Sequence, residues 1–91
     1  MLNSSAKEKA ASLWKNEEFK TGFVDAASTF KEDVEQGVDM FADLFSNYPQ
    51  VFYLDNADRK TLFGKMLISS SLREDRNDIL KGIGLMFGRV S

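Results

Sequence analysis

The stretch from Gly22 to Pro49 reads GFVDAASTFKEDVEQGVDMFADLFSNYP and decides the fold class. Its apolar residues recur at alternating intervals of four and three, which is the repeat of an amphipathic α-helix: Phe23, Ala27, Phe30, Val34, Phe41, Leu44 and Tyr48. Gly37 fills the single gap in this repeat, and flanking apolar residues widen the stripe enough to contact two or more neighbouring elements. The pattern predicts one long helix from about Asn16 to Asn47 at the centre of a helical bundle.

A shorter helical pattern precedes this stretch. Ser5 and Glu8 have the spacing of a capping box, in which each side chain satisfies the other residue's free backbone amide. A narrow apolar stripe follows at Ala6, Ala10, Leu13 and Trp14. Asn16 is suited to cap a second start, and the acidic residues after it favour the positive end of a helix dipole. We therefore expect a first helix that ends just before the long one begins.

The C-terminal half of the chain also predicts helices. Pro49 cannot continue a helix, so the long element should end there. Residues 50–54 have strand-forming side chains but no second strand to pair with, so we expect a short helical turn. Asp55 or Asn56 can cap the next helix, and Ser71 with Glu74 repeats the capping-box spacing before the last one. A helix that continues through the serines is the alternative, and it would leave an exposed apolar patch after residue 67.

These patterns predict an all-α protein, a small antiparallel bundle of about four helices with one long central helix, and a single domain over residues 1–91. A chain of this length buries only about 60 to 65 percent of its unfolded surface, so a homodimer stays open as a source of further stability. The expected core is Phe23, Phe30, Val34, Phe41, Leu44, Leu62, Phe63, Met66, Ile79, Leu80, Ile83 and Phe87.

The composition excludes several kinds of chemistry. The chain has no cysteine and no histidine, so it lacks disulfides, thiol catalysis, serine–histidine catalysis and the ordinary zinc ligands. No stretch has the ligand spacing of a calcium-binding EF-hand. We find no arrangement of carboxylates, lysines, serines and tyrosines that resembles a catalytic site. We therefore expect a non-enzymatic protein without metal or cofactor.

Membrane and secretion signals are also missing from the sequence. The first nine residues, MLNSSAKEK, have no apolar segment like that of a signal peptide. No later run approaches the roughly 20 apolar residues that cross a bilayer. We expect a cytoplasmic protein without a membrane partner.

Three glycines near the C-terminus, Gly82, Gly84 and Gly88, do not have the spacing of a phosphate-binding loop, and no strand precedes them. Glycine costs up to about 1 kcal/mol in a helix, so its presence needs a reason. We expect another helix to approach closely at Gly84 and Gly88. A short amphipathic segment that seeks membranes is the alternative.

Charge is unevenly distributed along the chain. Seven acids and one lysine give residues 21–55 a net charge of −6, whereas residues 1–20 carry +1 and residues 56–91 carry +3. The helical repeat places five acids opposite the apolar stripe: Asp25, Glu32, Glu35, Asp39 and Asp43. Such a row can be a solvated helix face or a contact surface for a partner with a basic patch. We expect a protein–protein interaction module, acting as a regulator, inhibitor or adaptor, that binds through these five acids or through exposed aromatic residues.

A nucleic-acid-binding regulator is the alternative function. Its basic residues would come from the C-terminal helices: Lys60, Lys65, Arg73, Arg76, Lys81 and Arg89. Acidic residues at positions 74, 75 and 78 interleave with two of these cations and would repel phosphate. For this reason a protein is the preferred partner and nucleic acid the second choice.

Overall fold

The described part of the protein is almost entirely helical. The computed structural model describes the backbone of residues 4–90 and the side chains of residues 7–88. Within that part it has five α-helices, three 3-10 helices and no strand. In chain order they are α1 (Ser4–Ala11), η1 (Ser12–Lys15), α2 (Glu17–Glu32), α3 (Val34–Asn47), η2 (Pro49–Tyr53), α4 (Asn56–Ile68), η3 (Arg73–Asp75) and α5 (Arg76–Val90).

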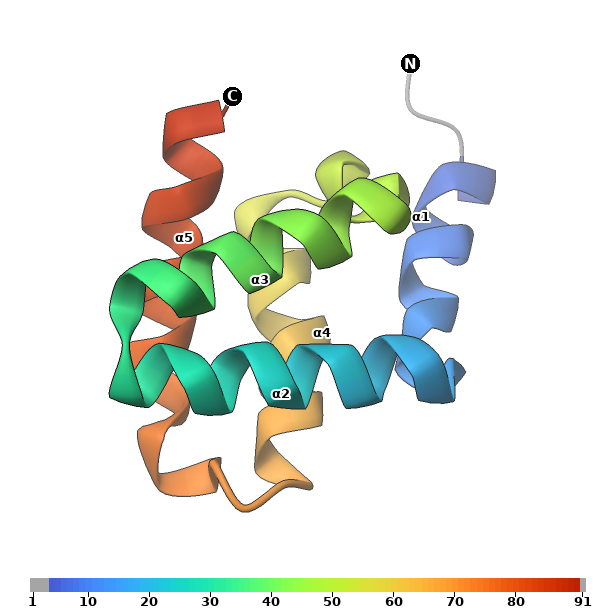
Figure 1. Cartoon of the computed structure of the whole chain (residues 1–91). Coiled ribbons are helices and arrows are strands. Elements are labelled where there is room, and N and C mark those ends of the chain that lie inside the picture. Colours follow the sequence, from blue (N-terminus) through green and yellow to red (C-terminus); the bar gives the residue numbers. More distant parts are fainter. Residues whose placement is uncertain (1–3, 91) are drawn as a thin grey trace.

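The helices form two layers (Figure 1). Helices α2 and α3 lie side by side as an antiparallel hairpin, and α4 and α5 form a second antiparallel hairpin that crosses behind the first. Helix α1 packs against η2 at the end of the layers opposite to α5. The predicted all-α bundle is therefore confirmed. None of the described helices has the length and apolar character needed to cross a membrane.

The prediction of one long helix over Asn16–Asn47 is wrong, because the chain reverses at Asp33. That residue has an extended backbone, with φ −147° and ψ 101°, and separates α2 from α3. Its Oδ1 atom accepts a hydrogen bond of 3.2 Å from the Gln36 amide, which caps α3. Its own amide donates to the Thr29 carbonyl at 2.7 Å and so closes α2. A single residue thus serves both helix ends, and the apolar repeat continues across the break without a shift that would reveal it.

Aromatic side chains fill the space between the layers. Phe19, Phe23, Phe41, Phe45 and Phe63 are all at most 1% exposed. Phe63 of α4 stacks on Phe23 with ring centroids 4.9 Å apart and on Phe45 at 5.5 Å, so it joins both helices of the front hairpin. Pairs of this geometry contribute about 0.5–1.5 kcal/mol beyond the burial of their area.

The expected core is confirmed at most positions but not at all of them. Val34 is 58% exposed, because the break places it in the first turn of α3, facing away from the core. Phe30, Leu44 and Leu80 pack against the core but are only partly buried. The chain also buries aromatic residues that the prediction omitted, Phe19 and Phe45.

The helix ends test the predicted caps. Asn16 Oδ1 accepts the Phe19 amide at 2.9 Å and Asp55 Oδ1 accepts the Asp58 amide at 2.8 Å, so both caps are confirmed. Residues 50–54 lie in and just after the 3-10 turn η2, as expected. The capping box at Ser5 lies outside the described side chains.

The predicted start of the last helix is wrong. No side chain caps the turn that follows Ser71; instead Ser70 Oγ accepts the Leu72 amide at 3.1 Å and donates to the Leu67 carbonyl at 2.8 Å. This local bonding forms a compact turn, and Leu72 beyond it is only 4% exposed. The 3-10 turn η3 then intervenes, so α5 begins at Arg76.

Two glycines permit close helix packing, but they are not the expected pair. A Cβ atom at Gly37 would lie 2.3 Å from the Cα atom of Phe30, and one at Gly82 would lie 2.2 Å from Cζ of the same residue. At Gly84 and Gly88 it would meet no atom of the described residues within 4 Å, so the close helix approach predicted there is not found among them. The close approaches join α2 to α3 and α2 to α5.

One ion pair joins the two layers at their edge. Lys31 Nζ on α2 lies 2.7 Å from Asp75 Oδ2 in η3. The hydrogen bond from Lys31 to Asp75, and then the negative charge of that carboxylate, raise the pKa of Lys31 above its ordinary value of 10.5. The pair therefore stabilises the folded state while Lys31 is protonated.

We predict opposite effects of alanine at two glycines. Gly37→Ala should lower the free energy of unfolding by about 1–3 kcal/mol or more, because the new methyl group meets the backbone of α2. Gly84→Ala should raise it by about 0.5–1 kcal/mol, because the site is open and alanine favours a helix. Urea denaturation of both variants measures the difference. Equal effects would contradict the packing described at Gly37.

We also predict a pH dependence for the Lys31 ion pair. A raised pKa in the folded state means that the stabilisation is fully present below the unfolded pKa and is lost as the pH rises through the folded pKa. The stability difference between wild type and Lys31→Gln should therefore hold up to about pH 10 and then shrink. Urea denaturation at increasing pH measures it. The difference for Lys15→Gln, which lies in no ion pair of the described side chains, should change less over the same range.

Candidate functional site

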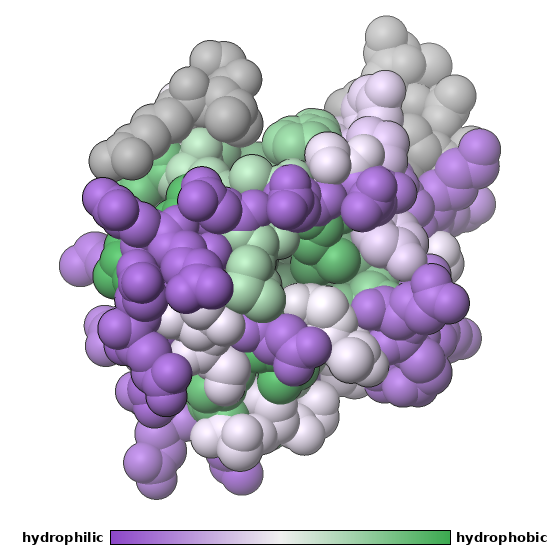
Figure 2. Space-filling view, in the orientation of Figure 1, coloured by the Kyte–Doolittle hydropathy of each residue, from purple (hydrophilic) through white to green (hydrophobic). Residues whose placement is uncertain are grey.

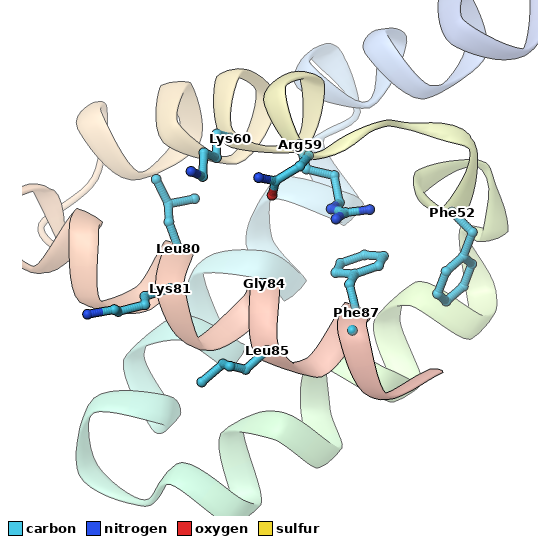
Figure 3. Close-up of a pocket in the computed structure, with 10 residues that line it drawn as sticks. Phe52, Arg59, Lys60, Leu80, Lys81, Gly84, Leu85 and Phe87 are labelled. Carbon is cyan, nitrogen blue, oxygen red and sulfur yellow. The ribbon is translucent and has the colours of Figure 1, made fainter. Parts of the chain in front are cut away.

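A groove of about 730 Å³ lies between α4 and α5 and is closed at one end by η2 (Figure 3). Its volume exceeds that of three other hollows in the described part of the chain, which measure about 330, 220 and 10 Å³. Ten residues line it: Phe52, Asn56, Arg59, Lys60, Leu80, Lys81, Gly84, Leu85, Phe87 and Gly88. Apart from Asn56, the polar side chains among these residues are cations, so the lining offers apolar contacts and positive charge.

The apolar part of the groove includes side chains that a folded protein normally covers. Phe52 is 47% exposed and Leu85 is 65% exposed. Phe52 is held in place because its ring meets Phe87 edge-on, with centroids 5.4 Å apart, and contacts Phe45 at 6.5 Å. The short turn η2 buries Val51 completely, which directs the next side chain outward. The groove is therefore a preformed apolar surface.

Gly84 opens the α5 side of the groove. A methyl group at this position would project into empty space, with no atom within 4 Å. The backbone of α5 is thus accessible at this glycine, and the side chains of Leu80 and Leu85 lie next to it (Figure 3). A side chain here would occupy part of the hollow. Among the described residues, no packing contact therefore requires a glycine at position 84.

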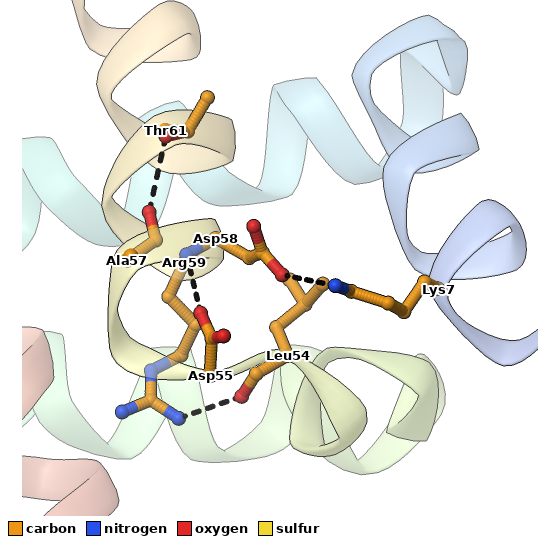
Figure 4. Close-up of polar contacts among 7 residues, drawn as sticks. All are labelled: Lys7, Leu54, Asp55, Ala57, Asp58, Arg59 and Thr61. Carbon is orange, nitrogen blue, oxygen red and sulfur yellow. Dashed lines mark hydrogen bonds and ion pairs between the residues drawn. The ribbon is translucent and has the colours of Figure 1, made fainter. Parts of the chain in front are cut away.

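Three cations surround the apolar surface. The guanidinium carbon of Arg59 lies 4.2 Å from the centre of the Phe87 ring, and its Nη1 atom donates to the Leu54 carbonyl at 3.2 Å (Figures 3 and 4). These contacts orient Arg59 at the mouth of the groove. Lys60 and Lys81 are exposed. None of the three forms an ion pair with a carboxylate among the described side chains.

The start of α4 is organised by several short polar contacts (Figure 4). Asp55 caps the helix, Thr61 Oγ1 donates to the Ala57 carbonyl at 3.0 Å, and Lys7 of α1 lies 3.2 Å from Asp58 Oδ2. Asp58 thereby faces α1 and not the groove. Because the acid next to Arg59 points away, the basic character of the groove is not neutralised.

The five predicted contact residues are all exposed, but the break at residue 33 divides them between two helices. Asp25 and Glu32 lie on α2, whereas Glu35, Asp39 and Asp43 form a row with a spacing of four along α3. On the face shown in Figure 2, hydrophilic side chains cross the region where α3 lies. None of the five pairs with a cation of residues 7–88. Their role as a contact surface stays a prediction.

Sequence analysis identified only part of the groove. It counted Lys60 and Lys81 among the basic C-terminal residues and expected exposed aromatics, of which Phe52 and Tyr53 are examples. Leu85 was not predicted to line a site, because it lies next to the apolar stripe of the last helix, a position typical of a core residue. Sequence analysis also did not place Arg59 on an aromatic ring, because that contact joins two helices distant in sequence.

The described residues contain no group of three or more acidic side chains placed to hold a metal ion. The chain matches no protein-family model, no curated protein and no solved structure. A function must therefore be argued from the surface itself.

We predict that the acids of α3 do not contribute to folding. Glu35→Gln, Asp39→Asn and Asp43→Asn, combined in one variant, should leave the free energy of unfolding unchanged or raise it by a few tenths of a kcal/mol. The reason is that like charges four residues apart in a helix repel. Asp55→Ala should instead cost about 1 kcal/mol, because it removes a helix cap. A large loss of stability in the triple variant, measured by urea denaturation, would assign these acids a structural role.

Proposed function

We propose that the protein is a non-enzymatic interaction module that binds an acidic, amphipathic segment of a partner protein in the groove between α4 and α5. The observation that carries the proposal is the combination of exposed Leu85 and Phe52 with three cations that form no ion pair among the described side chains, all around one open hollow. The cellular role that fits such a module is that of a regulator, inhibitor or adaptor.

The apolar surface supports the proposal because its exposure costs stability. Five large apolar residues in the described part of the chain are exposed. Two of them, Phe52 and Leu85, line this groove. Covering such area is favourable by about 25 cal/mol per Å². Aromatic and leucine side chains in a hollow are also the usual anchor points for partner residues. A partner that inserts apolar side chains between Phe52 and Leu85 would recover this free energy.

The charges indicate the sign of the partner. Arg59, Lys60 and Lys81 have no acidic residue beside them in the groove lining. A segment with carboxylates on the flanks of an apolar stripe would place opposite charges against these cations. Arg59 can also offer two donors to one carboxylate. Its guanidinium has five N–H groups, and Nη1 uses one of them in its hydrogen bond to the Leu54 carbonyl.

The shape favours a helical segment. A groove between two antiparallel helices accepts a third helix, which presents side chains at intervals of three and four residues. Because Gly84 has no side chain, an occupant helix can approach the backbone of α5 closely at this position. An extended peptide would need an exposed strand edge to pair with, and residues 4–90 contain none.

Single-stranded nucleic acid is a second candidate for the same surface. The observation in its favour is the exposed ring of Phe52 near three cations, since bases stack on aromatic rings and phosphates contact cations. The groove places its cations around several apolar side chains and only one exposed ring, which fits a helix with an apolar face better than a row of bases.

Peptide binding tests the proposal. The probe is a synthetic helical peptide of about 18 residues with leucines on one face and glutamates on both flanks, long enough to be helical in isolation. We expect it to bind wild type. Lys60→Gln combined with Lys81→Gln should weaken binding by at least about threefold, since exposed ion pairs contribute about 0.2–1 kcal/mol each. Leu85→Ser should weaken it by about tenfold. Fluorescence anisotropy measures each dissociation constant.

Matched variants control for net charge and for general loss of apolar surface. Lys9→Gln with Lys15→Gln removes the same charge far from the groove, and Ile68→Ser removes another exposed apolar side chain. Circular dichroism verifies that every variant folds. The proposal is wrong if the control variants weaken binding as much as the groove variants, or if the peptide does not bind. Tighter binding of a single-stranded oligonucleotide than of the peptide would favour the second candidate.

A further inference from the structure

The two layers of the molecule carry opposite charge. Residues 17–47, which form the α2–α3 hairpin, have eight acids, two lysines and a net charge of −6, and residues 56–91, which contain the α4–α5 hairpin, have +3. Because the hairpins occupy different layers (Figure 1), this imbalance along the sequence becomes a separation in space. The molecule therefore has an acidic side and a basic side.

The outer surface of α3 has the features that the groove requires of an occupant. Glu35, Asp39 and Asp43 are exposed, and no basic residue occurs between Val34 and Asn47. A row of apolar residues runs beside the acids at Val34, Val38 and Ala42. Val34 is 58% exposed, Ala42 is exposed and Val38 is partly exposed. This is an acidic helix face with an apolar border, already folded and presented to solvent.

Within one molecule the two surfaces do not meet. No ion pair among the described side chains joins an acid of α3 to Arg59, Lys60 or Lys81. Helix α3 contacts α2, α5 and η2 through its buried side, so its acidic side faces away from the protein. The acidic face of one molecule can therefore reach a groove only in another molecule.

We infer that a second copy of this chain occupies the groove, with the acidic face of its α3, formed by Val34, Glu35, Val38, Asp39, Ala42 and Asp43, against α4 and α5 of the first. The inference rests on the proposed function, since it identifies the partner segment that the groove binds. The inference rests on charge complementarity. Three cations of the groove and three acids of α3 form no ion pair among the described side chains, and the proposed contact would bring them together. Because the two contacting surfaces differ, copies associate head to tail and form a ring or an open chain.

The contact should be weak and sensitive to salt. It covers one helix face and one groove, which is less surface than the roughly 1,200 Å² of a stable complex. Its ion pairs lie at the edge of the contact, where salt screens them within about 10 Å at an ionic strength near 0.1 M. Association should therefore require high protein concentration and should decrease when salt is added.

Sedimentation velocity with charge-reversed variants tests the inference. Wild type should associate between about 10 µM and 1 mM protein in low salt and dissociate near 0.5 M salt. Lys60→Glu with Lys81→Glu, or Asp39→Lys with Asp43→Lys, should each raise the dissociation constant at least about tenfold, because like charges then face each other. An equimolar mixture of the two double variants should associate again, since each variant then meets an opposite charge.

Control variants with the same change in net charge lie away from both surfaces. They are Lys9→Glu with Lys15→Glu, and Glu8→Lys with Glu18→Lys, all at exposed positions without an ion pair in the described side chains. These should associate like wild type, and their mixture should gain nothing.

Several outcomes would overturn the inference. Wild type that stays monomeric at about 1 mM while the acidic peptide still binds the groove would remove the second copy as occupant and leave the proposed function intact. Association that neither double variant weakens would place the contact elsewhere. Failure of the mixture to associate would contradict the pairing of α3 with the groove. Loss of both peptide binding and self-association would reject the proposed function together with the inference.

Discussion

The contact of Phe30 with two glycines determines how the helices are arranged. The backbone of Phe30 lies so close to Gly37 that a Cβ atom there would be 2.3 Å away, and the tip of its ring lies equally close to Gly82. One residue of α2 thus sets the spacing of the front hairpin and the position of α5 behind it. The break at Asp33 is possible because this approach lets α3 pack along α2 as soon as the chain reverses.

The position of α5 in turn creates the groove. With Gly82 held against Phe30, the opposite side of α5 faces away from the front layer. A Cβ atom at Gly84 then meets no described atom within 4 Å, Leu85 is 65% exposed, and α4 and η2 form the rest of the wall. Two glycines separated by one residue therefore have opposite roles, because successive side chains on a helix point in different directions. One permits internal packing, and the other leaves a surface open.

The same arrangement separates the charges. The front hairpin holds most of the acids and two lysines, and the rear hairpin holds most of the arginines. The separation leaves few ion pairs within one molecule, since the described side chains form three. It does add specificity to any encounter, because a basic groove attracts acidic partners and repels basic ones. An apolar hollow alone would not discriminate between them.

The sequence by itself determined the features that depend on a few neighbouring residues. The helical repeat, the caps at Asn16 and Asp55 and the turn after Pro49 follow from local geometry and local hydrogen bonds, and all were predictable. The spacing of Asp33 and Gln36 also fits a capping box, so the start of α3 had a local signal. That signal was ambiguous because the apolar repeat passes through residue 33 without interruption.

Where the sequence is compatible with two structures, only the tertiary packing decided between them. A continuous helix and a hairpin both fit the apolar repeat, and the hairpin prevails because Phe23, Phe41 and Phe63 then share one core. The roles of Gly82 and Gly84 depend on which side of α5 meets α2, and no local pattern contains that information. The groove likewise joins Phe52, Arg59 and Leu85 from three separate elements, so it exists only once the two layers have packed.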